Sequence, residues 1–108
     1  MYVVSNQSSY DLEVYMVVTG KDTLVNVPSS SEKTVYTDQR IGGLKDDGSY
    51  FLKFGGIDSI WPIINDTLSI SKSMMDRSNW NYSTQLTKVN KKNGYNIYTY
   101  TLSDSDVQ

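Results

Sequence analysis

The side chains that most often carry catalytic chemistry are missing from this sequence. It contains no His and no Cys, which excludes Ser-His-Asp triads, thiol nucleophiles and nearly all zinc, haem and iron–sulfur sites. Acid–base catalysis would fall to a close pair of carboxylates, yet most Asp residues here occupy turn-forming segments. We expect no catalytic residues, no cofactor and no enzymatic activity. A two-carboxylate enzyme is the remote alternative.

Two acidic pairs offer the oxygen ligands that Ca²⁺ prefers. They are Asp46 with Asp47 and Asp104 with Asp106. Neither pair matches the spacing of an EF-hand loop. Solvated acidic loops explain both pairs more simply, so the sequence predicts no metal site.

Aromatic side chains are the best candidates for a binding surface, because an exposed indole beside Tyr can stack on a sugar ring or anchor a protein. Trp80 lies in a polar stretch near Tyr82, and a surface or a core position explains it equally well. Trp61 lies in an isoleucine-rich segment, which favours a core position. Trp61, Trp80 and Tyr82 are the candidate contacts for a glycan or protein partner.

The charge balance argues against a nucleic-acid partner. Ten Lys and Arg residues stand against twelve Asp and Glu residues, with a net charge of −2, whereas nucleic acids and anionic membranes attract basic surfaces. No stretch approaches the roughly 20 apolar residues of a membrane helix, and no signal-like segment is visible. We therefore expect neither a nucleic acid nor a direct membrane contact.

The elements that must position these side chains are β-strands. The chain is rich in Tyr, Val, Ile and Thr, which suit a pleated sheet, and it has no Ala. Its 108 residues correspond to a single domain, residues 1–108. Aromatic residues at 12% supply enough apolar area to exclude disorder.

Alternating apolar residues predict the individual strands. Leu12, Val14, Met16 and Val18 form one face of a strand over 10–19. Pro62 lacks the N–H of a central strand, so the less regular segment 57–64 should lie at an edge, a bulge or a crossing. Hairpin turns are expected at 20–22 and 90–94, and one helical turn between 72 and 81. Further strands are expected at 2–4, 23–27, 32–37, 50–54, 67–71, 82–89 and 95–102.

Seven or eight short strands, with turn signals about ten residues apart, predict an all-β fold. The expected architecture is an antiparallel β-sandwich, and a small β-barrel is the alternative. In the last strand, Tyr98, Tyr100 and Leu102 share one face. We interpret that strand as central and structural rather than as a tyrosine platform.

Three segments resemble a known group of proteins. Residues 3–14, 27–35 and 98–106 are similar to the beginning, middle and end of small Bacteroidetes envelope lipoproteins. The resemblance implies an immunoglobulin-like or related β-sandwich, exported to the cell envelope or secreted as an outer-membrane lipoprotein or periplasmic protein. It also implies a lipidated Cys preceding Met1, so that the membrane would be contacted only through that anchor. Because these proteins are largely of unknown function, it assigns no catalytic residues.

The same resemblance implies a modification. Three Asp-Ser/Thr-apolar triplets resemble the O-glycosylation acceptor of Bacteroidetes, and their hydroxyls belong to Thr23, Ser59 and Thr67. We expect a non-enzymatic envelope module with an interaction or structural role, whose partner is an unknown protein or glycan. The alternative is a carbohydrate-binding module that uses Trp80 and Tyr82, with Trp61.

Overall fold

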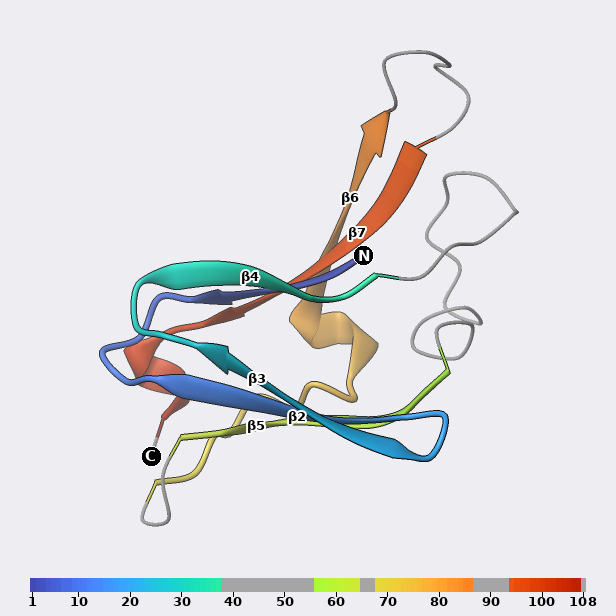
Figure 1. Cartoon of the computed structure of the whole chain (residues 1–108). Helices are drawn as coiled ribbons and strands as arrows, with labels where there is room; N and C mark the ends of the chain where they lie inside the picture. Colours follow the sequence, from blue (N-terminus) through green and yellow to red (C-terminus); the bar gives the residue numbers. More distant parts are fainter. Residues whose placement is uncertain (38–55, 65–67, 87–93, 108) are drawn as a thin grey trace.

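The computed structural model describes residues 1–37, 56–64, 68–86 and 94–107. These residues form two packed sheets (Figure 1), which confirms the all-β sandwich; the described strands do not close into a barrel. The strands are β1 (Tyr2–Asn6), β2 (Leu12–Val18), β3 (Lys21–Val27), β4 (Ser31–Tyr36), β5 (Ile57–Ile63), β6 (Trp80–Leu86) and β7 (Gly94–Leu102).

Two single-turn 3₁₀ helices complete the elements. They are η1 (Arg77–Asn79), which confirms the helical turn expected between 72 and 81, and η2 (Asp104–Asp106). Within the described ranges, no helix has the length and apolar character needed to cross a membrane.

The four-stranded sheet has the order β4-β1-β7-β6. Neighbouring strands in this sheet run antiparallel, except that β1 and β7 run parallel, with Val4 opposite Tyr100. The expectation of purely antiparallel sheets is therefore wrong for this pair. Parallel neighbours need a long crossover, and here nearly the whole chain supplies it. β7 is central, as the sequence predicted.

The three-stranded sheet has the order β3-β2-β5. The hairpin between β2 and β3 turns at Thr19 and Gly20, whose φ angles are 47° and 80°. The expected turn at 20–22 is thus displaced, and Lys21 already pairs with Val18. Two consecutive residues with positive φ make a tight two-residue hairpin turn, so the strands pair right up to it.

Among the described strands, β5 lies at one edge of this sheet and β3 at the other. Pro62, which pairs with Val14, therefore removes no hydrogen bond from a second neighbour. The register also shifts between Val17 and Val18. These features confirm the edge position expected for Pro62.

Of the strand expected at 67–71, residues 68–71 are described; they form isolated bridges and no regular strand, and the segment that follows covers one end of the core. Ile70 makes an isolated bridge with Val107. The Tyr100 hydroxyl donates to the Lys72 carbonyl at 2.6 Å, and the Lys72 ammonium donates to the Thr101 carbonyl at 2.7 Å. These contacts with β7 hold the segment away from a regular ladder.

Three other boundaries need comment. β6 begins at Trp80, two residues before its expected start. β6 and β7 form the expected antiparallel hairpin, although its turn lies outside the described residues. The strand expected at 50–54 lies outside them as well.

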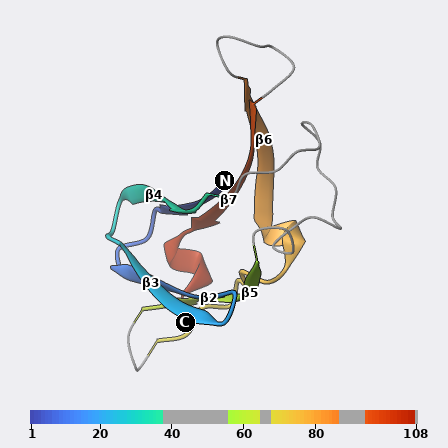
Figure 2. The same ribbon diagram turned by 45° about the vertical axis from the view of Figure 1, so that its right-hand side comes forward.

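Figure 2 shows the two sheets facing each other, and the buried apolar side chains of both sheets form the core between them. Leu12, Val14 and Met16 point into it and are buried, as their alternation predicted. The four-stranded sheet contributes an aromatic cluster in which the Tyr2 ring centroid lies 5.5 Å from Tyr98 and 5.8 Å from Trp80. Such pairs add about 0.5–1.5 kcal/mol each beyond the area that they bury.

Candidate functional site

The three aromatic residues proposed from sequence do not form one surface. Trp80 is only 2% exposed, and its indole Nε1 donates to the Met74 carbonyl at 2.8 Å. Tyr82 is half-buried, with its hydroxyl bonded to Asn96 at 2.6 Å. Both belong to β6, whereas Trp61 lies on β5 of the other sheet. Stacking of Trp80 on a glycan is therefore wrong for this structure, because its ring serves the core.

Trp61 is 40% exposed, so the core position favoured from sequence is wrong. Its neighbour Ile60 is fully buried and pairs with Met16 on the inner side. Because successive residues of a strand point to opposite faces, Trp61 points outward. Its ring packs on Tyr15, with centroids 4.5 Å apart and planes inclined by 35°.

The candidate site is the outer surface of the three-stranded sheet, which we call the apolar face. Tyr15 occupies its centre, flanked by Leu24 of β3 and Trp61 of β5. Leu24 is 53% exposed. An exposed apolar patch of this kind commonly marks an interaction site. The apolar face consists of Tyr15, Val17, Leu24, Trp61 and Ile63.

Tyr15 and Leu24 were not singled out from sequence, although a signal for them was present. The alternation that buries Val14 and Met16 also directs Tyr15 outward. The β2–β3 hairpin then places Leu24 opposite Tyr15. The sequence pattern did not reveal that β2 pairs with β5, which lies about 40 residues further along the chain and brings Trp61 beside Tyr15.

Carboxylates border the apolar face. A hydrogen bond with Asp22 is the main cause that raises the pKa of Tyr15, followed by partial burial and by the charge of Asp22. Glu13 lies two residues before Tyr15 on the same side of β2, and is exposed. The hydroxyl of Tyr15 thus stays protonated well above neutral pH.

A hollow adjoins this face where β2 begins and β3 ends. Its volume is about 340 Å³. One of its acids, Asp11, accepts a hydrogen bond from the Ser29 backbone at 3.0 Å. The hollow extends the binding surface beyond the flat sheet. Its lining residues are Asp11, Leu12, Glu13, Asn26, Pro28 and Ile64.

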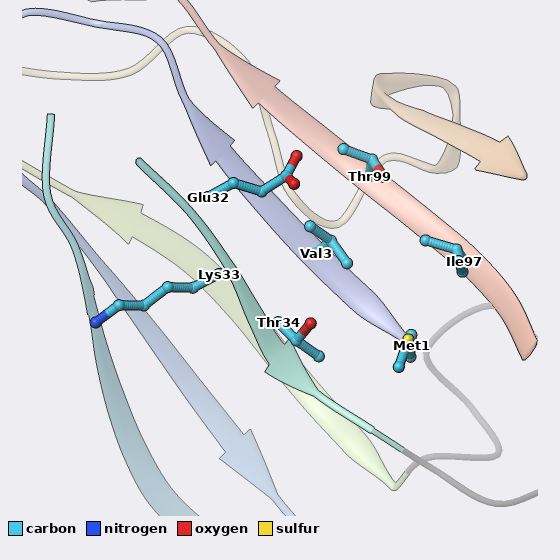
Figure 3. Close-up of a pocket in the computed structure, with 7 residues that line it drawn as sticks. All are labelled: Met1, Val3, Glu32, Lys33, Thr34, Ile97 and Thr99. Atoms are coloured by element: carbon cyan, nitrogen blue, oxygen red, sulfur yellow. The ribbon is translucent and has the colours of Figure 1, made fainter. Parts of the chain in front are cut away.

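A second depression, of about 310 Å³, lies on the outer surface of the four-stranded sheet (Figure 3). Val3, Thr34 and Thr99 form its floor, with Glu32 directed toward β1 and β7 and Lys33 directed away. It contains one carboxylate and no exposed aromatic ring, so it offers a partner less contact energy than the apolar face.

The acidic residues considered for metal binding have other functions where they are described. The Asp104 carboxylate accepts hydrogen bonds from the Ser9 backbone at 2.7 Å and the Ser9 hydroxyl at 2.9 Å. Asp106 closes a capping box with Ser103. Across the described residues, no group of three or more metal-ligating side chains gathers. Asp46 and Asp47 lie outside them.

The three hydroxyls expected to be O-glycosylated differ in position. Thr23 is exposed on β3, and Ser59 is partly exposed on β5 beside the apolar face. Thr67 lies outside the described residues.

Comparison of the chain with protein-family models, curated proteins and solved structures finds no match. What defines the protein is therefore its own geometry: a β-sandwich whose three-stranded sheet exposes an aromatic and aliphatic face.

Proposed function

We propose that this protein is a non-enzymatic interaction module that binds a protein partner through the apolar face. The observation that carries the proposal is the exposed Tyr15–Trp61 pair beside Leu24. Trp and Tyr contribute most to protein interfaces because they bury much area with few rotatable bonds. Burial of Leu24 adds about 25 cal/mol per Å² of apolar surface covered.

The core holds this surface rigid. Val14 and Met16, on either side of Tyr15, are both buried, and β2 pairs with strands on both of its edges. Tyr15 therefore binds without first having to become ordered, which lowers the entropic cost of association.

Site-specific photo-crosslinking tests the proposal. A benzoylphenylalanine at position 24 should give one defined protein adduct in native cells, identified by mass spectrometry. The adduct should be lost in the Trp61→Ala background. The same group at Thr34, exposed on the other sheet, is the control. Equal adducts from both positions, or none from position 24, would contradict the proposal.

Carbohydrate binding is the second candidate, since the exposed Trp61 packs beside Tyr15, with the polar side chains of Glu13 and Asn26 in the neighbouring cross-strand row. Rings stack on the apolar face of a sugar, while amides and carboxylates bond its hydroxyls. A glycan array with the wild type and Trp61→Ala tests it. Retained glycan binding in Trp61→Ala would reject this site.

We also propose that the protein acts in the cell envelope, supported by the resemblance of residues 3–14, 27–35 and 98–106 to envelope lipoproteins. Fractionation of native cells should recover it with the envelope. Mass spectrometry of the native protein should find hexose on Thr23, Ser59 or Thr67, and the absence of hexose from all three would reject the O-glycosylation. A hydrolase screen whose turnover is abolished by one carboxylate substitution would overturn the non-enzymatic role.

A further inference from the structure

The outward side chains of the three-stranded sheet form three cross-strand rows. The register of β2 with β3 and β5 defines each row, with one residue from each strand. The rows are about 7 Å apart, since each spans two strand residues. They read Asn26–Glu13–Ile63, Leu24–Tyr15–Trp61 and Asp22–Val17–Ser59.

Charge is distributed unevenly over these rows. The central row is entirely apolar or aromatic, whereas each outer row contains one carboxylate, Glu13 or Asp22. No cation occupies any position of the three rows. A partner complementary to this surface therefore has an apolar centre and positive charge on both sides.

A second copy of this chain does not meet that requirement. A two-fold contact between two apolar faces would bring Glu13 close to Glu13 or Asp22 of the other copy, depending on the direction of the axis. Like charges brought together at an interface disfavour the complex. The hollow beside Glu13, which also contains Asp11, adds room for a long side chain at one outer row.

We propose that the apolar face recognises an extended protein segment with a cationic side chain, an aliphatic side chain and a second cationic side chain at positions i, i+2 and i+4. This spacing matches the three rows, because side chains on one face of an extended segment are also about 7 Å apart. The aliphatic side chain packs on Tyr15 and Leu24, and the cations pair with Glu13 and Asp22. The inference rests on the proposed function and names its partner's chemistry.

Two synthetic peptides test it. The first, acetyl-Thr-Arg-Thr-Leu-Thr-Arg-Thr-amide, has the proposed spacing; in the second, neutral citrulline replaces both Arg residues at nearly the same shape. Titrations followed by amide NMR shifts should map the arginine peptide to β2, β3 and β5. Its affinity should exceed that of the citrulline peptide about tenfold at low salt, which corresponds to about 1.4 kcal/mol.

The charge contribution is isolated with variants. Glu13→Gln combined with Asp22→Asn should reduce the arginine-to-citrulline ratio to near one. Glu32→Gln, on the other sheet, should leave the ratio unchanged. About 1 M NaCl should also reduce it, because the screening length is then only about 3 Å.

The outcomes separate this inference from the proposed function. Equal affinities, or no shifts with either peptide, overturn the cationic partner, while a cross-link from position 24 that depends on Trp61 still supports a protein-binding face. Loss of that cross-link overturns the proposed function itself. A glycan that shifts the same amides when the arginine peptide does not would assign the face to carbohydrate.

Discussion

Asn6 is a fully buried polar side chain at the end of β1. Its Nδ2 donates to the Tyr10 carbonyl at 2.7 Å and to the Val27 carbonyl at 2.9 Å. Its Oδ1 accepts from the Ser8 backbone at 3.1 Å and the Ser8 hydroxyl at 2.6 Å. One side chain thus joins β1 to the β1–β2 connection and to β3 of the other sheet.

Replacing Asn6 with Asp should destabilise the protein by about 2–3 kcal/mol. The carboxylate keeps the shape but has no donors for the carbonyls of Tyr10 and Val27, and unsatisfied buried groups cost about 1–3 kcal/mol, more when charged. Urea unfolding at neutral pH measures the loss. Asn81→Asp, exposed on β6 opposite the uncharged Thr99, is the matched control and should change stability by less than about 0.5 kcal/mol. Equal effects would contradict the role of Asn6.

Asp104 makes the free energy of unfolding depend on pH in the acidic range. Its hydrogen bonds from the Ser9 backbone, then from the Ser9 hydroxyl, hold the pKa of the carboxyl below its ordinary value. These hydrogen bonds therefore stabilise the folded protein fully when the pH is above the pKa that Asp has in the unfolded chain, about 3.9. The stabilisation is lost as the pH falls through the lower pKa of the folded protein.

Asp104→Asn should therefore be less stable than the wild type at neutral pH, and the difference should shrink as the pH falls below about 4. Urea midpoints measured across this range check the trend. Glu32→Gln, which removes one exposed charge, controls for net charge. A difference that grows on acidification would reject the bond with Ser9 as its cause.

At the scale of elements, two glycines with positive φ lie at the junction where β2 turns into β3 and β5 begins. Gly20 has φ +80° with open space around it, whereas a Cβ on Gly56, at φ +74°, would lie 2.8 Å from the Thr19 methyl group. The Thr19 backbone also donates to the Gly56 carbonyl at 2.9 Å. Gly56 thus lets the start of β5 approach the hairpin turn closely.

Gly20→Ala should cost about 1 kcal/mol from backbone strain alone. Gly56→Ala should cost more, because it adds the collision with Thr19. Adding Thr19→Ser, which removes only the methyl group, should recover the excess and leave the strain, with a coupling of about 0.5–2 kcal/mol. Thermal or urea unfolding of the single and double variants measures it. Additive effects would contradict the close approach.

At the scale of the whole molecule, β1 holds the four-stranded sheet together. It pairs with β4 on one edge and β7 on the other, and Tyr2, Val4 and Asn6 point into the core. A fully buried apolar side chain contributes about 1.5–3 kcal/mol, while a whole domain has only about 5–15 kcal/mol. β1 therefore contributes a large share of the stability.

Deletion of residues 1–6 should abolish cooperative folding, since β4 would then lose its partner in the sheet. Circular dichroism and amide NMR dispersion measure the loss, and deletion of Met1 alone is the control. A synthetic peptide of residues 1–10 added to the truncated chain should restore dispersion. A cooperative transition in the truncated chain without the peptide would contradict this role of β1.

Much of the fold was predictable because local pattern decides it. Alternation in a single strand identifies the buried face of Leu12, Val14 and Met16, and the missing N–H of Pro62 assigns β5 to an edge. The candidate site was harder to predict. Trp61 is exposed although its isoleucine-rich neighbours favoured the core, and Trp80 is buried although its polar neighbours favoured neither position.

The sequence by itself determined that this chain forms strands, which of their residues alternate inward, and that His and Cys chemistry is absent. Only the tertiary structure decided that β1 runs parallel to β7, that Trp80 closes the core, and that Trp61 meets Tyr15 and Leu24 on the outside. The physical reason is the separation along the sequence of the residues that interact. Periodicity reflects residues a few positions apart, whereas strand order and the composition of a sheet face depend on contacts between segments tens of residues apart, which no local pattern encodes.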